Sequence, residues 1–444
     1  MPTPTVVDAE TPVGLPLSAR FRQSFAYFSM TSRNPDILEH TMASLRESPP
    51  GGADVETLCK EGFGQSGSVR QLSQLLEEMR GDASWPQLTS TAGDAALWNK
   101  LLRAAGCACS RHWLTAPWIV AESYMYRRVR QATEASALAD PAQPPDPFLP
   151  VKQKTFAAGM PAIQALAEWM AEAGTSREDL SRLLKTATRA NAADLSLSAG
   201  VVPDQDELTA ITAPSDDAFI ADQSETVWTV LQSGAGCVTV DLVCDNMGYE
   251  LFADLCLAQL LTTLGATRVR IHLKRVIFIN INEAHPYYVS DATMDDLQYL
   301  LEQLTTGDAP EAARLLAVDW KDRLQDGGPW IASAEYFWTL PLTYDRMPKE
   351  DPKLYAELQE SALAIFKGDV NFRKLVGDLR WPVETRLEHA VRGFRPCPMA
   401  ALRTIKSETA VGLKPGQEKQ LDASQPGWMT SGQLALIVCV PEFI

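Results

Sequence analysis

The chain has 444 residues, of which 45% are hydrophobic, so it can build one large core or two domains. Its formal net charge is −16, and no basic face or tail stands out, which argues against a nucleic-acid partner. No apolar run reaches the length of a membrane span, and the N-terminus lacks the regions of a signal peptide. These features predict a cytoplasmic protein, and they leave its oligomeric state open.

Cysteine usage favours the same compartment. None of the eight cysteines forms a Cys-x-x-Cys pair, and several stand inside apolar runs. Because disulfides are rare in the reducing cytosol, we expect free buried thiols.

The first half of the chain is predicted to be helical. Residues 1–19, rich in Pro, Thr and Val, are expected to form a flexible tail. From residue 20, apolar residues recur at a spacing of three to four, which indicates helices. A proline-rich connection at 137–150 separates two such blocks. We therefore expect an α-helical lobe over 20–215.

From residue 216 onward, apolar strand-like runs alternate with helical patterns. Such alternation produces a mostly parallel sheet covered by helices on both faces. The expected fold class is α/β, with a three-layer α/β/α sandwich over 216–444 that carries the N-terminal helical lobe. The predicted strands lie within 233–246, 266–281, 362–366, 401–413 and 432–440.

Polar residues follow three of the strand-like segments, where each joins a helix. Asp245 and Asn246 are followed by Gly248 and Glu250, Asp291 stands before a second helix, and 367–374 follows a third apolar run. In an open α/β sheet, ligands bind beyond the carboxyl ends of the strands. Asp245, Asn246 and Asp291 would offer oxygen ligands that suit Mg²⁺ or Mn²⁺ better than Zn²⁺.

The basic residues of 367–374 would add phosphate-binding groups beside that metal. A divalent metal next to a basic pocket favours phosphoryl chemistry. Each segment alone also fits a simpler explanation. Asp245-Asn246 and Ser290-Asp291 could be helix N-caps, and Lys367-Gly368-Asp369 could be a plain turn. His272 and His285 are interpreted as structural residues.

Taken together and in this order, seven segments resemble one family. They are similar to the metal-dependent damage-control phosphatases, once called domain of unknown function 89, in the branch with an Arg-Thr-x-Lys motif near the C-terminus. The segments are 24–38, 113–129, 146–154, 245–255 (DNMGYELFADL), 285–296 (HPYYVSDATMDD), 366–381 (FKGDVNFRKLVGDLRW) and 402–413 (LRTIKSETAVGL).

The resemblance implies a phosphatase that cleaves phosphomonoesters of sugar phosphates and related phosphometabolites, of the fructose 1-phosphate type. Mn²⁺ or Mg²⁺ would activate it, with Ni²⁺ or Co²⁺ as alternatives, and its partner would be a small phosphorylated molecule. The site residues that it implies fall into three groups. The metal ligands are Asp245, Asn246 and Asp291; the substrate-binding residues are Asp369, Asn371, Arg373 and Lys406; Glu250 and Asn191 line the site.

Three departures from the family pattern suggest that the substrate has shifted. Arg189 and Ala190 stand where the family has Trp and Gly before Asn191, the segment before Asp291 is longer, and Val370 and Phe372 replace Leu and Tyr. An alternative is thus a biosynthetic phosphatase or diphosphatase acting on a secondary-metabolite phosphate. The branch has also been linked to S-adenosylmethionine-dependent protein-glutamate O-methylation, for which the sequence offers no glycine-rich cofactor loop of the usual kind.

Overall fold

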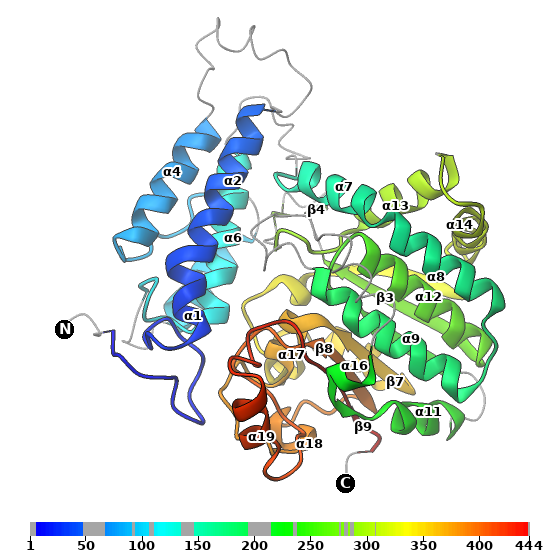
Figure 1. Ribbon diagram of the computed structural model, residues 1–444. Helices are drawn as coiled ribbons and strands as arrows, with labels where there is room; N and C mark the ends of the chain where they lie inside the picture. The colour runs from blue at the N-terminus through cyan, green and yellow to red at the C-terminus, as the bar shows by residue number, and fades with distance from the viewer. Residues whose placement is uncertain are drawn as a thin grey trace, which may run out of the picture.

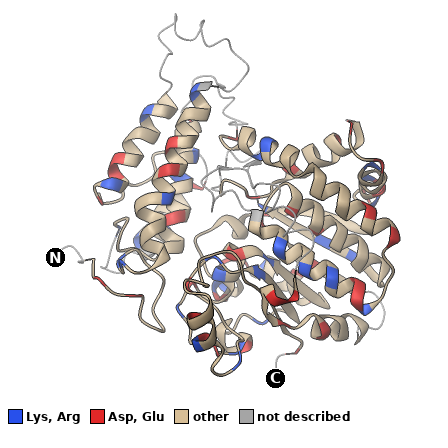
Figure 2. Ribbon diagram, viewed as in Figure 1, with Lys and Arg blue, Asp and Glu red and all other residues tan. Residues whose placement is uncertain are grey.

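A helical bundle and an α/β sandwich lie side by side in the computed structural model of the protein (Figure 1). The residues that the structure describes are 6–47, 67–90, 94–105, 111–134, 146–193, 215–233, 238–274, 277–278, 283–284, 288–306 and 308–442. Basic and acidic residues are interspersed along the helices of both parts (Figure 2).

Seven strands of the described residues form one sheet, in the order β1-β9-β8-β7-β2-β3-β6. They are β1 (Phe219–Asp222), β2 (Val238–Val243), β3 (Ala266–Lys274), β6 (Trp330–Glu335), β7 (Leu363–Lys367), β8 (Met399–Thr404) and β9 (Ala435–Val440). The run from β8 to β6 is parallel, whereas β9 and β1 point the opposite way. Two short strands, β4 (Ile277–Phe278) and β5 (Glu283–Ala284), pair separately.

The centre of the sheet contains a change of direction in the chain. From β2 the chain continues to β3 and β6 on one side, and then returns to β7 on the other side of β2. At such a point the loops that leave neighbouring strands diverge and open a crevice at the carboxyl edge. The ends of β2 and β7 are therefore where this fold offers room for a ligand.

Helices cover both faces of the sheet, which confirms the predicted α/β class. On the first face lie α8 (Met160–Glu172), α9 (Arg177–Ala190), α11 (Ser224–Ser233), α12 (Tyr249–Thr263), α13 (Met294–Thr306) and α14 (Glu311–Arg323). The second face is covered by η4 (Tyr336–Thr339), η5 (Tyr344–Arg346), α15 (Met347–Glu350), α16 (Pro352–Gln359), α17 (Gly368–Leu375), α18 (Leu387–Ala390) and α19 (Gln417–Ser424). Alternate residues of β7 serve the two cores: Leu363 and Ile365 face the first, Ala364 and Phe366 the second.

The bundle has its own core of leucine, methionine and aromatic side chains. Its helices are α1 (Phe25–Phe28), α2 (Asn34–Glu47), α4 (Gly67–Arg80), α5 (Ala95–Ala105) and α6 (Trp118–Glu134). A π-helical turn, η1 (Ser29–Arg33), joins α1 to α2. π-Helical turns are rare and often mark functional sites.

The second predicted helical block packs with the sandwich. It consists of α7 (Leu149–Ala158), α8 and α9. The apolar residues of α8 and α9 share a core with α12 and the sheet, whereas the bundle core contains Phe148 and, from far along the chain, Tyr288 and Val289. Amphipathic spacing predicts that a helix has an apolar face, but it does not say which core that face joins.

Residues 6–19 also differ from the predicted flexible tail. The backbone N–H groups of Gly14 and Leu17 donate to the carbonyls of Arg380 and Asp378, at 2.7 and 2.9 Å. Leu17 is fully buried in the bundle core. Backbone pairing with a distant segment has no signal in the composition of 1–19.

Two further sequence expectations can be compared with the structure. Free thiols are confirmed for the cysteines of the described residues, which are Cys244, Cys256, Cys397 and Cys439. The other four cysteines lie outside the described residues. In the described part of the chain, every helix is too short or too polar to cross a membrane.

Glu408 connects the segment after β8 to the bundle, and it should make stability depend on pH. Its carboxylate accepts the N–H of Phe25 at the start of α1, and burial raises the pKa of Glu408 from 4.5 to about 7. Because the folded form binds this proton more tightly than the unfolded chain, the carboxyl costs stability increasingly as pH rises from 4.5 to about 7.

Glu408→Gln should therefore raise the free energy of unfolding by up to about 3 kcal/mol at pH 8, and by much less near pH 5. Urea unfolding at the two pH values measures the difference, with the exposed Glu311→Gln as control. An equal effect at both pH values would contradict the account.

Candidate active site

Asp245 and Asn246 follow β2 directly, and both are buried. The helix after them, α12, has Gly248 as its N-cap, with a φ of 89° and no side-chain cap. Asp245 and Asn246 are therefore not helix caps, which removes the simpler explanation of this pair.

A hydrogen-bond cluster fixes the side chains at the end of β2. The Asn191 Nδ2 donates to Asp245 Oδ2 at 3.0 Å and to Glu250 Oε2 at 3.1 Å. The Asn246 Nδ2 donates to the same Glu250 oxygen at 2.8 Å. The structure thus brings together four predicted site residues from η2 (Asn191–Ala193), the end of β2 and α12.

Asp291 joins this cluster through the backbone. Met247 N donates to Ser290 O at 2.7 Å and Ala292 N to Asp245 O at 2.8 Å, so Asn246 and Asp291 face each other in an antiparallel bridge. The two facing residues do not hydrogen-bond to each other, and in antiparallel pairs of this kind the side chains lie closer together than in hydrogen-bonded pairs.

The N-cap predicted at Ser290 or Asp291 is wrong. The cap of α13 is Thr293, whose Oγ1 accepts the N–H of Asp296 at 3.2 Å. Ser290 instead donates to Asn246 Oδ1 at 2.8 Å, and Asp291 Oδ2 accepts the N–H of Tyr288 at 2.8 Å. The Ser290 side chain is therefore directed to the cluster, and the Asp291 carboxylate is held by the backbone of its own turn.

The donor set of Asp245, Asn246 and Asp291 fits a hard divalent cation. It consists of two carboxylates and an amide oxygen, each held by a neighbouring donor, as ligands of a metal usually are. Burial raises the pKa of Asp291, a cost that a bound cation would offset. In the described residues, this edge included, no group of three or more His, Cys, Asp or Glu side chains is placed to hold a metal, so a cation here would depend on the Asn246 amide oxygen beside two carboxylates.

Gly368 is a close neighbour of Asp245. It begins α17 with a φ of 85°, and a Cβ built on it would lie 1.8 Å from Asp245 Oδ2. A side chain here would displace the carboxylate. The Asp245 carboxylate can therefore occupy its position only because the residue that follows β7 is a glycine.

Buried basic residues surround the cluster. Lys367, at the end of β7, pairs with Glu250 at 3.0 Å and with Asp254 at 2.7 Å. Burial raises the pKa of Asp254 to about 7, against the effect of Lys367. Burial and the nearby Lys274 ammonium lower the pKa of Lys374 to about 7.

Asn371 joins the ends of three strands. Its Nδ2 donates to Lys367 O at 2.7 Å and to Cys244 O at 3.2 Å. Its Oδ1 accepts from Lys274 Nζ at 3.1 Å and from Tyr344 OH at 2.7 Å. The side chain that the sequence predicted to hold substrate thus ties together β2, β3 and β7.

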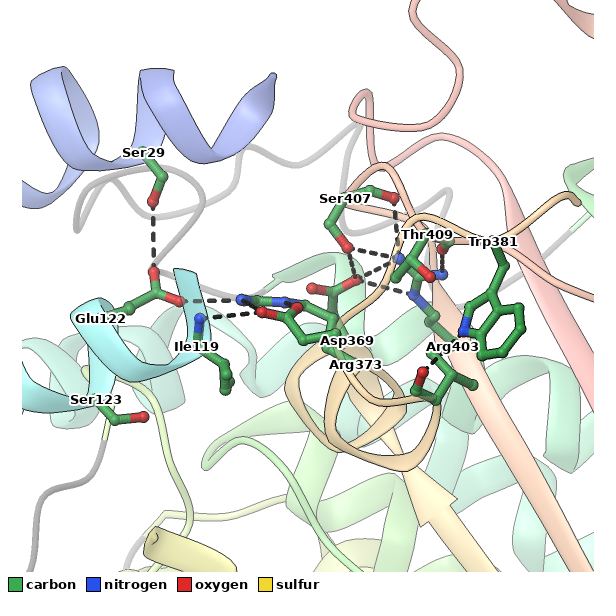
Figure 3. A network of polar contacts seen from close by, with 12 residues as sticks. Ser29, Ile119, Glu122, Ser123, Asp369, Arg373, Trp381, Arg403, Ser407 and Thr409 are labelled. Carbon is green, nitrogen blue, oxygen red and sulfur yellow. Dashed lines mark hydrogen bonds and ion pairs between the residues drawn. The ribbon is translucent and has the colours of Figure 1, made fainter. Parts of the chain in front are cut away.

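Asp369 lies in a network with Arg403 and Ser407 (Figure 3). Arg403 Nε donates to Asp369 Oδ1 at 2.9 Å, and Ser407 Oγ to the same oxygen at 3.2 Å. Although burial acts to raise it, the guanidinium groups of Arg403 and Arg373 hold the pKa of Asp369 below its usual value. Asp369 is therefore an ionised acceptor.

Arg373 points to the bundle (Figure 3). Its Nε donates to Asp378 at 2.8 Å, and its NH1 to Glu122 of α6 at 3.1 Å. The guanidinium carbon lies 3.5 Å from the ring centroid of Trp118. Arg33 of η1 pairs with the same Glu122 at 2.5 Å. The structure thus places Arg373 in an ion-pair network between the two parts of the protein.

Lys406 and the changed segment at 189–193 lie beside each other. The Lys406 ammonium donates to the carbonyl of Asn191. Arg189 donates to the carbonyls of Gly432 and Gln433, at 3.0 and 2.9 Å, so it contacts the segment before β9. Asp194 and most of the longer segment before Asp291, including His285, lie outside the described residues.

Two residues at this edge were not predicted as site residues. Lys274 and Arg403 stand at the ends of strands, and that position is the only signal the sequence carries. Lys367 and Lys374 belong to the segment 367–374, whose basic residues the sequence predicted to bind phosphate. His272 is a structural residue, as predicted: its Nε2 lies 2.7 Å from Asp241 Oδ1 inside the sheet.

Gly368→Ala should disrupt the site by moving Asp245, in addition to straining the backbone at positive φ. We expect Mn²⁺ binding, measured by calorimetry, to weaken roughly tenfold or more. Gly393→Ala is the matched control, because Gly393 has a φ of 90° and open space around its Cβ position. It should cost about 1–2 kcal/mol of stability and leave metal binding intact. Unchanged Mn²⁺ affinity in Gly368→Ala would refute the close approach.

Glu122→Gln should destabilise the folded protein by about 3 kcal/mol, because it leaves two buried guanidinium groups short of a negative charge. Urea unfolding measures this loss. Glu225→Gln, at an exposed pair with Arg177, should change stability by less than about 1 kcal/mol. Equal effects would mean that the buried network contributes no more than a surface pair.

Comparisons with known proteins concern the family of the chain and not the geometry of the site. A family model described as "Damage-control phosphatase ARMT1-like domain" matches residues 32–421. Proteins named damage-control phosphatase ARMT1 from Xenopus tropicalis and Homo sapiens are 33% and 32% identical to the chain, over 95% of its length and 97% of theirs. A solved DUF89 family protein from Pyrococcus horikoshii aligns with 87% of this chain and 98% of its own, at 14% identity and a TM-score of 0.42. The chain belongs to the ARMT1-like damage-control phosphatase family.

Proposed function

We propose that the protein is a metal-dependent phosphatase that hydrolyses phosphomonoesters of sugar phosphates or related phosphometabolites, of the fructose 1-phosphate type. The observation that carries this proposal is the cluster of Asp245, Asn246 and Asp291 at the carboxyl edge of the sheet, with buried lysines around it. Family membership supports phosphatase chemistry, since the matching relatives are named phosphatases.

Asp245, Asn246 and Asp291 would hold the metal, either Mn²⁺ or Mg²⁺, with Ni²⁺ or Co²⁺ as alternatives. A divalent ion there supplies charge to polarise a phosphoryl oxygen. Glu250 and Asn191 would contact the side chains of the metal ligands. They receive or donate the hydrogen bonds that fix the Asp245 and Asn246 side chains.

The chain's other groups would position the substrate. Asp369 is ionised and its side chain is 11% exposed, so it can accept a hydrogen bond from a substrate hydroxyl. Lys406, on the segment after β8, would neutralise negative charge beside Asn191. Arg373 is engaged by Asp378 and Glu122, and we therefore assign it to holding α17 in place.

Asp245→Ala should abolish phosphate release, because it removes a metal ligand and the acceptor for Asn191. The assay measures inorganic phosphate from a panel of sugar phosphates, with Mn²⁺, Mg²⁺, Ni²⁺ or Co²⁺ and with EDTA. Asp319→Ala, on the exposed side of α14, is the control and should retain full activity. Wild-type turnover in folded Asp245→Ala would overturn the assignment.

The same panel separates the rival substrates. Release from a bulky secondary-metabolite phosphate, with none from fructose 1-phosphate, would favour the biosynthetic phosphatase. Absence of metal-dependent release, together with calorimetric binding of S-adenosylmethionine, would favour the methyltransferase.

A further inference from the structure

Two buried lysines at the same edge are given no individual role in the function proposed above. Lys274 is the last residue of β3, and Lys374 lies on α17. They are 2% and 1% exposed, respectively. A buried ammonium group is costly unless something compensates its charge, so both positions require an explanation.

Each lysine makes fewer hydrogen bonds than its ammonium group could donate. Lys274 Nζ donates to Asn371 Oδ1 at 3.1 Å, and Lys374 Nζ donates to Trp338 O at 2.7 Å. An ammonium group has three N–H donors. Each described contact is to a neutral oxygen, so neither provides the counter-charge.

Other buried basic groups nearby are compensated by ion pairs. Lys367 pairs with Glu250 and Asp254, Arg373 with Glu122 and Asp378, and Arg403 with Asp369. Lys274 and Lys374 form no such pair with a carboxylate of the described residues. Both lysines therefore lack, among the described residues, an ion-pair partner that would match a positive charge.

Both lysines lie within electrostatic range of the predicted metal ligands. The ammonium groups of Lys274 and Lys374 act to lower the pKa of Asp291. The carboxylates of Asp291 and Asp245 act to raise the pKa of Lys374. Lys274 is also tied to that segment by its backbone N–H, which donates to Ala292 O at 2.9 Å. The segments that carry the two lysines and the two carboxylates therefore meet at one edge of the sheet.

We propose that Lys274 and Lys374 bind the phosphoryl group of the substrate and select dianionic phosphomonoesters over monoanionic phosphodiesters. This inference rests on the proposed function. A divalent ion would balance the two carboxylate charges of Asp245 and Asp291. The remaining positive charge would then belong to the two lysines, and a phosphomonoester dianion would balance it. Two charge-assisted contacts would also orient the phosphoryl oxygens.

The test is calorimetric titration of inorganic phosphate into wild-type protein and into Lys274→Met and Lys374→Met, each in Mn²⁺ and in EDTA. Methionine keeps the apolar stem and removes the charge. Each variant should bind inorganic phosphate about 10- to 100-fold more weakly, as expected for a lost charged hydrogen bond. In hydrolysis, KM should rise by a similar factor, with a smaller change in kcat.

Selectivity gives a second readout that a structural role would not move. Wild-type protein should bind inorganic phosphate at least about tenfold more tightly than dimethyl phosphate, and both variants should lose most of that preference. Lys185→Met is the matched control, because Lys185 is already paired with Asp216 and Asp222 at 2.7 and 3.0 Å. It should leave both affinities unchanged.

The outcomes separate this inference from the proposed function. If wild-type protein releases phosphate from the panel but both variants keep its KM and phosphate affinity, the lysine site is wrong and the phosphatase stands. If wild-type protein binds phosphate through the lysines but hydrolyses nothing on the panel, the lysine site stands and the phosphatase fails. Wild-type protein that binds no inorganic phosphate overturns the lysine site. If one variant does not fold, the other decides by the same criteria.

Discussion

The side-chain amide of Asn371 fixes the edge at which the candidate site is built. It is fully buried, and its five described partners come from the ends of β2, β3 and β7 and from η5. The diverging segments after β2 and β7 would otherwise be free to separate, since the chain leaves these strands in different directions. With the strand ends tied, Gly368 can approach the Asp245 carboxylate and the Asn246–Asp291 bridge can form.

The helical bundle is coupled to this edge by buried charge. Glu122 on α6 pairs with Arg373 (Figure 3) and also with Arg33, and Arg373 pairs in addition with Asp378. Asp378 in turn accepts the N–H of Ile119 at 3.0 Å. Because a buried ion pair is costly to break by removing one partner, this network should fix α17 against the bundle more firmly than apolar contact alone. It also explains why Arg373, which the family pattern implies as a substrate residue, lies among carboxylates.

The sequence predicted best those features that depend on the spacing of apolar residues or on the position of polar residues at the end of a strand. Alternation of strands and helices predicted the α/β sheet. Polar residues at a strand end predicted that Asp245, Asn246 and Glu250 lie together, whereas Asn191 was implied only by the family resemblance. Short strands such as β1 and β6 were not predicted, because half-buried edge strands give a weak apolar signal. The packing of α8 and α9, the docking of residues 6–19 and the position of Lys274 all depend on contacts between distant segments, which one sequence does not encode locally.

The central claim is that Asp245, Asn246 and Asp291 form a divalent-metal site. Anomalous diffraction from a crystal soaked in Mn²⁺ tests it most directly, because the anomalous signal locates the ion without reference to activity. The account predicts a peak bound by oxygens of these three side chains. A strong peak elsewhere with none at this edge, or a peak that persists here in Asp245→Ala with other ligands, would contradict it.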